Sequence, residues 1–121
     1  MGVPASAVVL FVEDEAIVRL DAIDSLTDAG FRVIEAANAD EAIAILESRH
    51  DIRVVVSDIQ MPGAMDGLKL AAIIGDRWPP IALILTSGRI SVREQDLPEH
   101  GRFLPKPYTS TGLIAAIQAA L

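Results

Sequence analysis

The sequence contains no cysteine among its 121 residues, and aromatic side chains make up only 4% of it. The lack of cysteine excludes disulfide bonds, thiolate metal sites and catalysis by a thiol. With so few aromatic residues, the core must be built from Val, Ile, Leu and Ala, which suits a buried parallel sheet covered by alanine-rich helices. Hydrophobic residues reach 51%, which is too many for a disordered chain.

Long apolar runs and basic stretches are also missing. No run approaches the roughly 20 apolar residues that a membrane span needs, and the N-terminus lacks the basic and apolar regions of a signal peptide. The net charge of −7 is not accompanied by any basic stripe, which argues against direct binding of nucleic acid. We therefore expect a soluble, cytoplasmic protein with one domain, residues 1–121.

Short apolar runs that are typical of buried strands alternate with stretches that are typical of helices. Strands are expected at 8–12, 32–36, 54–58, 81–85 and 103–104, and helices at 16–29, 39–48, 67–78 and 108–121. Five such alternations imply parallel strands joined by right-handed crossovers. The sequence therefore predicts a three-layer α/β fold with a doubly wound, five-stranded parallel sheet.

Local signals refine some of these boundaries. Gly30 is placed to end the first helix, and Asn38 with Glu41 resembles a capping pair that opens the second. The segment 89–100 is polar and is broken by Pro98. We expect a short or irregular helix in that segment.

Charged and hydroxyl side chains follow the ends of several predicted strands. Glu13 and Asp14 come directly after the first strand, Asp58 ends the third, Thr86 follows the fourth, and Lys106 follows the fifth. In open α/β sheets, ligands bind beyond the carboxyl ends of the strands, where the strand order switches. If the first and third strands are neighbours, these five residues meet in one crevice.

Three carboxylates in one crevice would repel each other and raise each other's pKa unless a cation joined them. A divalent ion with oxygen ligands resolves the repulsion, and Mg²⁺ suits a site that has few protein ligands. The ion would also offset the charge of an incoming phosphoryl group, which leaves a carboxylate free to attack phosphorus. Lys106 would add a positive charge, and Thr86 a hydroxyl donor.

Four motifs carry a resemblance to the receiver domains of two-component response regulators. They are VEDE at 12–15, SDIQMPG at 57–63, LTSG at 85–88 and LPKPY at 104–108, each at the end of an expected strand. The resemblance covers nearly the whole chain and implies the flavodoxin-like strand order 2-1-3-4-5. It also implies a phosphoprotein in signal transduction, acting in a two-component system or phosphorelay, and not an enzyme that turns over an outside substrate.

The resemblance implies a role for each residue of the site. Asp58 is expected to accept the phosphoryl group. Asp14 is expected to bind Mg²⁺ directly, Glu13 through water, and Gln60 through its backbone carbonyl. Lys106 would pair with the phosphoryl group and precede a cis peptide bond to the next residue, Pro107.

Two further residues correspond to the conformational switch of the family. Thr86 would move toward the phosphoryl group, and Phe103 would turn inward in response. Phe103 lacks the hydroxyl of a tyrosine, so an ordinary core phenylalanine is the alternative at that position. Glu13 stands where aspartate is commoner in the family, and we expect this to change metal affinity more than mechanism.

The implied partners are a histidine kinase or a histidine phosphotransfer protein that donates the phosphoryl group, and a downstream protein target. In the last helix, Leu113, Ile117 and Leu121 share one apolar face that is expected to pack on the sheet. Ile114 and nearby alanines offer a second strip that could support a homodimer.

Other functions fit the sequence less well. A flavin-binding protein would need a small, polar loop where Glu13-Asp14-Glu15 stands. A phosphatase of the haloacid dehalogenase type would carry its aspartates after the first strand, and a P-loop enzyme would need a glycine-rich loop that ends in Gly-Lys-Ser/Thr. A degenerate receiver-like scaffold that acts by protein–protein interaction without phosphorylation is the remaining alternative.

Overall fold

The computed structural model describes residues 7–61, 63 and 65–121. Its strands are β1 (Val8–Val12), β2 (Arg32–Ala36), β3 (Ile52–Asp58), β4 (Ala82–Ser87) and β5 (Gly101–Pro105). Its helices are α1 (Ala16–Asp28), α2 (Ala39–Ser48), α3 (Gly67–Arg77) and α4 (Ser110–Ala120), with one 3₁₀ turn, η1 (Glu94–Asp96). The strands form one parallel sheet in the order β2-β1-β3-β4-β5, which confirms the predicted fold class and strand order.

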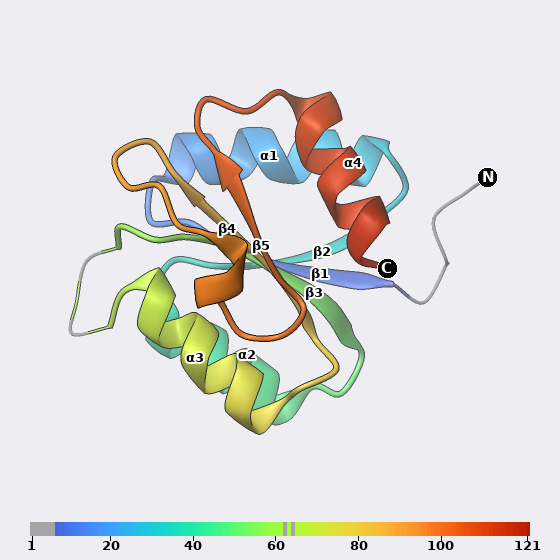
Figure 1. Cartoon of the computed structure of the whole chain (residues 1–121). Coiled ribbons are helices and arrows are strands. Elements are labelled where there is room, and N and C mark those ends of the chain that lie inside the picture. Colours follow the sequence, from blue (N-terminus) through green and yellow to red (C-terminus); the bar gives the residue numbers. More distant parts are fainter. Residues whose placement is uncertain (1–6, 62, 64) are drawn as a thin grey trace.

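The three central strands are apolar because helices cover both faces of the sheet. Every residue of β1 and β4 is buried, and β3 is buried except for Arg53. Helices α1 and α4 cover one face, and α2 and α3 cover the other (Figure 1). Alternate residues of each strand therefore contribute to different cores, as the period of two in a strand requires: Leu10 packs on the α2–α3 side and Phe11 on the α1–α4 side.

The helix ends follow the capping signals of the sequence. The Asn38 side chain accepts a hydrogen bond from the Glu41 backbone at 2.9 Å, which confirms the predicted cap of α2. Gly30 follows α1 with φ of +99°, a left-handed conformation that glycine adopts without strain. The Thr109 side chain caps α4 by accepting from Gly112, so this helix begins at Ser110 and not at the predicted residue 108.

The last strand is longer than predicted. It runs from Gly101 to Pro105, because hydrogen bonding to β4 extends beyond the two apolar residues that mark it in the sequence. The last helix packs as expected: Leu113 and Ile117 are buried against the α1–α4 side of the sheet, and Leu121 is partly buried there.

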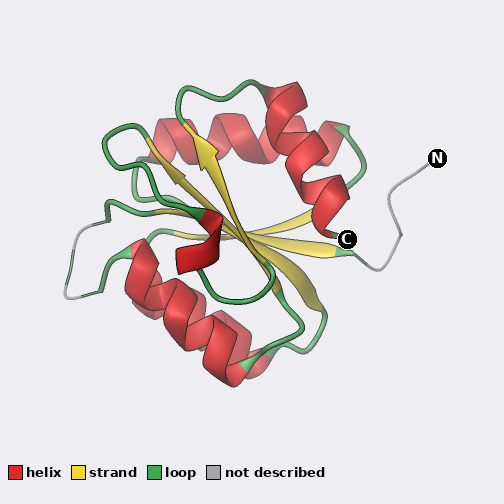
Figure 2. Ribbon diagram, in the orientation of Figure 1, coloured by secondary structure: helices red, strands yellow, loops and turns green. Residues whose placement is uncertain are grey.

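The segment between β4 and β5 contains a single 3₁₀ turn and is otherwise loop, which confirms the predicted irregular helix (Figure 2). Val92 and Leu97 nevertheless pack against the core on the α2–α3 side. Pro98 lies directly on α3, where a Cβ added to Gly75 would be 2.6 Å from the Cβ of Pro98. The segment is therefore attached to α3 although it forms no α-helix.

Candidate functional site

The register of the sheet brings the predicted site residues to one edge. Val12 pairs with Ser57, so Glu13 lies level with Asp58 at the ends of β1 and β3. Asp58 in turn pairs with Thr86 on β4. Lys106 follows β5, and its backbone N–H donates to the Ser87 carbonyl at 3.0 Å. The strand order β2-β1-β3-β4-β5 thus places these residues around one crevice, as the strand ends in the sequence predict.

Glu13, Asp14 and Asp58 form a cluster of carboxylates. One oxygen from each of them lies within 4.8 Å of the others. Glu13 is 2% exposed and Asp58 is 9% exposed, whereas Asp14 is open to solvent. The Glu13 Oε2 atom accepts a hydrogen bond from the Glu15 backbone at 3.1 Å, which holds this side chain against the start of α1.

Lys106 bridges two of these carboxylates. Its Nζ lies 3.0 Å from Asp58 Oδ2 and 3.4 Å from Glu13 Oε1. Burial lowers the pKa of Lys106, but the hydrogen bond to Asp58 and the charges of Glu13 and Asp58 outweigh it, so its pKa is raised overall. The side chain therefore stays charged. The peptide bond from Lys106 to Pro107 is cis, as the sequence resemblance implies.

Burial also governs the titration of Glu13. Loss of hydration raises its pKa, and the Asp58 charge adds to this, while the Glu15 N–H and the Lys106 charge act in the opposite direction. The balance leaves the pKa of Glu13 above its ordinary value. A second cation beside Lys106 would offset this cost of burial.

The donor atoms of the crevice fit a hard divalent ion. Mg²⁺ prefers carboxylate and carbonyl oxygens together with water. Asp58 Oδ1 is buried and has no hydrogen-bond partner among the described residues, so one acceptor beside Asp14 and Glu13 is left for such a ligand. A cavity of about 440 Å³ lies beside Asp14, and its lining also includes Gln60 and Ile90.

The remaining predicted residues lie around the crevice. Thr86 is buried at the end of β4, and its backbone carbonyl accepts from the Ile59 N–H at 2.9 Å. Gln60 lies two residues beyond Asp58, and its side-chain Oε1 accepts from the Ser87 hydroxyl at 2.8 Å. Phe103 is partly buried and packs on the α2–α3 side of the sheet, next to β4 rather than in the acidic cluster.

Sequence reasoning did not identify two structural features of this site. Gly67 begins α3 so close to the acidic loop that an added Cβ would lie 2.3 Å from the Asp58 carbonyl oxygen. Ser87 links Gln60 to the turn after β4. A glycine or serine at a loop boundary has many ordinary explanations, so the sequence holds no signal that singles out either contact.

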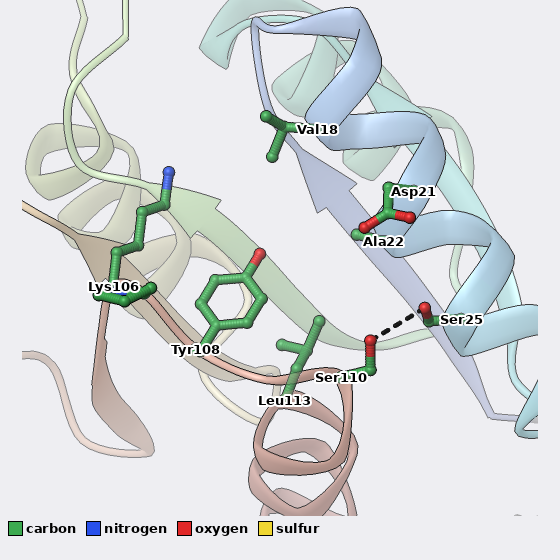
Figure 3. Close-up of a pocket in the computed structure, with 9 residues that line it drawn as sticks. Val18, Asp21, Ala22, Ser25, Lys106, Tyr108, Ser110 and Leu113 are labelled. Atoms are coloured by element: carbon green, nitrogen blue, oxygen red, sulfur yellow. Dashed lines mark hydrogen bonds between the residues drawn. The ribbon is translucent and has the colours of Figure 1, made fainter.

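A second cavity lies beside the crevice, between α1 and the connection from β5 to α4 (Figure 3). It has a volume of about 390 Å³, and its lining includes Lys106, Tyr108 and Leu113. Across it, the hydroxyls of Ser25 and Ser110 are 3.1 Å apart. Burial raises the pKa of the Tyr108 hydroxyl above its ordinary value.

A doubly wound parallel sheet with an acidic, lysine-bridged crevice at its switch point defines a signal-receiving domain of the chemotaxis-regulator type. The family model of the response regulator receiver domain matches residues 9–118, and the chain belongs to this family. It is therefore a receiver domain, which is a signalling domain of two-component systems.

Known proteins with similar sequences and structures agree. The chain is 37% identical to the sensor kinase CckA of Brucella abortus over 96% of its own length and 13% of the kinase. It is 32% identical to the transcriptional regulatory protein PdtaR of Mycobacterium tuberculosis, over 93% of the chain and 56% of that protein. The crystal structure of a response regulator receiver protein from Sinorhizobium medicae matches with a TM-score of 0.85 and 32% identity, covering 94% of this chain and 93% of the other.

The chain thus spans 13% and 56% of the lengths of these two curated relatives. Within the described residues, none of the helices is both long and apolar enough to cross a membrane.

Proposed function

We propose that this domain accepts a phosphoryl group on Asp58, in a reaction that requires Mg²⁺, from a phosphohistidine of a histidine kinase or a histidine phosphotransfer protein. The main support for the proposal is that the two oxygens of the Asp58 carboxylate differ in their hydrogen-bond partners. Lys106 holds Oδ2 at 3.0 Å, while Oδ1 is buried and has no hydrogen-bond partner among the described residues. A buried acceptor without a partner is costly, and such atoms in native proteins are often reserved for a ligand.

The chemistry follows from the residues of the crevice. Asp14, Asp58 and the Gln60 carbonyl would hold Mg²⁺, with Glu13 acting through water. The ion would supply positive charge to the phosphoryl oxygens. An Asp58 oxygen attacks phosphorus in line, so a new O–P bond forms as the P–N bond to the donor histidine breaks. The imidazole leaves with the electron pair of the broken bond and takes up a proton.

The charge change then reaches the rest of the domain. A bound phosphoryl group adds about two negative charges at neutral pH. Lys106 is already within 3.4 Å of both buried carboxylates, so it is placed to pair with the new charge. Thr86 lies directly across from Asp58 in the sheet register and would donate its hydroxyl to the same group. Phe103 pairs with Leu85, the residue before Thr86 on β4, and would repack when Thr86 moves.

An exposed apolar surface next to the crevice supports a protein as the phosphodonor. Ile17 is 84% exposed and Leu20 is 53% exposed, both on α1, whose first residues follow Asp14. Large apolar side chains that remain exposed beside a reactive site favour docking of another protein. The donor histidine would approach Asp58 over the start of α1, and a downstream protein target would read the surface near Phe103.

The proposal is tested by incubating the protein with acetyl phosphate, with and without Mg²⁺, and measuring the intact mass. We expect the mass to increase by one phosphoryl group in the presence of Mg²⁺ and no increase in its absence. Asp58→Asn should abolish the gain because the attacking oxygen is lost. Asp51→Asn is the matched control, since Asp51 is an exposed carboxylate that pairs with Arg49 away from the crevice.

Two results would contradict the proposal in different ways. Full labelling of Asp58→Asn would place the acceptor on another residue. No labelling of the unaltered protein under any condition, together with failure to bind beryllofluoride, would favour the degenerate scaffold that acts without phosphorylation.

A further inference from the structure

The Ser87 hydroxyl at the end of β4 has a full set of hydrogen-bond partners. It accepts from the backbone N–H groups of Arg89 and Ile90 at 3.0 and 2.9 Å. It also lies 2.8 Å from Oε1 of Gln60. Ser87 itself is 2% exposed, so water does not compete for these bonds.

This arrangement determines the orientation of the Gln60 side chain. A serine hydroxyl carries one proton and two lone pairs. Both lone pairs are used by the two backbone N–H groups, so the proton must be donated to Gln60. The atom that receives it must be the carbonyl oxygen, because a reversed carboxamide would set its NH₂ group against the hydroxyl proton.

The same orientation leaves the other end of the carboxamide without an acceptor. Gln60 Nε2 is buried and has no hydrogen-bond partner within the described residues. A buried donor in this state is costly, and an unpaired group of this kind in a native protein calls for an explanation such as a functional role or a bound ion or water. Gln60 lies two residues beyond Asp58 and lines the cavity at the mouth of the acidic crevice together with Asp14.

We propose that Ser87 is a positioning residue, which holds the Gln60 carboxamide so that its NH₂ group donates a hydrogen bond to an oxygen of the phosphoryl group on Asp58. The inference rests on the proposed function and adds to it a residue that acts through Gln60. Ser87 also ties this orientation to the turn at residues 88–90, where the segment without an α-helix begins.

The test is a double-mutant cycle on the binding of beryllofluoride, which mimics a carboxyl-bound phosphoryl group, in the presence of Mg²⁺. Loss of one hydrogen bond to a charged group should weaken binding by about tenfold or more in Gln60→Leu. Ser87→Ala should give a similar loss, because the carboxamide is then free to turn. The double variant should bind no more weakly than Gln60→Leu, since both changes remove the same bond.

Controls separate positioning from a general loss of structure. Ser57→Ala also removes a buried hydroxyl, 1% exposed and on the neighbouring strand, whose partners are the Asp58 carbonyl and the Met61 sulfur. We expect it to leave the affinity nearly unchanged. Ser87→Thr keeps the hydroxyl and should restore most of the affinity. Losses that add in the double variant would overturn the inference, because Ser87 would then act independently of Gln60.

A second measurement does not depend on phosphoryl chemistry. In ¹⁵N NMR spectra, the Gln60 NH₂ protons should be well separated from those of a free glutamine and should approach them in Ser87→Ala. Unchanged resonances in that variant would overturn the inference even if affinity fell. If the unaltered protein binds no beryllofluoride at all, the proposed function fails, and the phosphoryl role of Ser87 fails with it.

Discussion

The two ends of the sheet carry charged side chains in opposite ways. At the carboxyl end of the strands, Glu13 and Asp58 are almost fully buried and share Lys106 between them. At the amino end, Asp51 and Glu47 are exposed, and each has its own arginine: Arg49 Nη2 lies 2.6 Å from Asp51 Oδ2, and Arg77 Nη2 lies 2.9 Å from Glu47 Oε2.

The difference concerns how well each charge is compensated. Exposed ion pairs are screened by water and contribute little to stability. Buried carboxylates lose their hydration and are stable only when a partner replaces it. At the amino end, the charges of Asp51 and Glu47 are compensated, because each of these two acids faces an arginine. The carboxyl end keeps an excess of buried negative charge and a carboxylate oxygen without a described partner, which supports the proposed binding of a cation there.

The largest expected effect lies at the carboxyl end, where Gly67 packs closely against the acidic loop. Gly67→Ala should destabilise the protein by about 3 kcal/mol, because the added Cβ would lie 2.3 Å from the Asp58 carbonyl oxygen and 2.8 Å from the Ile59 Cα. Backbone atoms in a central strand cannot move aside easily. Denaturant unfolding measures the loss. Gly88→Ala is the matched control, since its Cβ would meet Lys106 at an ordinary 3.6 Å. Equal stabilities of the two variants would show that the acidic loop is less tightly packed than described.

A smaller effect concerns stability as a function of pH, whose sign should differ between the buried carboxylate Glu13 and the exposed carboxylate Asp51. The raised pKa of Glu13 means that the folded state holds this proton more tightly than the unfolded state. Its contribution to stability is therefore greatest in acid and is lost as pH rises through the folded pKa. Without metal, Glu13→Gln should stabilise the protein at neutral pH, and by less near pH 4.

Asp51 should behave in the opposite way. The hydrogen bond from Arg49 holds its pKa below the ordinary value, so its contribution is present above the unfolded pKa and is lost as pH falls through the folded pKa. Asp51→Asn should therefore weaken the protein slightly at neutral pH and have no effect in acid. Thermal unfolding with a chelator at several pH values checks both variants. The same sign for both would contradict the contrast between the two ends.

Much of the carboxyl end could be predicted from the sequence, because its residues are tied to the ends of strands. Apolar runs mark β1, β3 and β4, so Glu13, Asp58 and Thr86 are placed at the edge by the alternation of strands and helices alone. That β1 and β3 are neighbours came from the resemblance to receiver domains and not from the residues. The roles of these side chains likewise remain predictions, since they depend on an ion and a phosphoryl group.

Contacts that depend on how loops fold against other parts of the chain could not be predicted. The link from Ser87 to Gln60 spans 27 residues and depends on how two loops meet. The attachment of Pro98 to α3 at Gly75 has the same cause. Strand boundaries at the edge were also uncertain: β5 extends to Gly101 and Pro105 through pairing with β4, which no local pattern reveals.

The smallest expected effect lies at the amino end. Arg77 pairs with Glu47 and lies over the Trp78 ring, 4.3 Å from its centroid. The side chains of Arg77 and Glu47 are 44% and 53% exposed, so water screens their charges. Arg77→Ala should therefore lower the free energy of unfolding by less than about 1 kcal/mol in denaturant unfolding. Labelling by acetyl phosphate should be unchanged, because this pair lies at the opposite end of the sheet from Asp58. A loss of labelling would show that charges at the amino end are coupled to the acidic crevice through the strands. The pairing of each acid with a base would then not be enough to distinguish the exposed ion pairs of the amino end from a functional site.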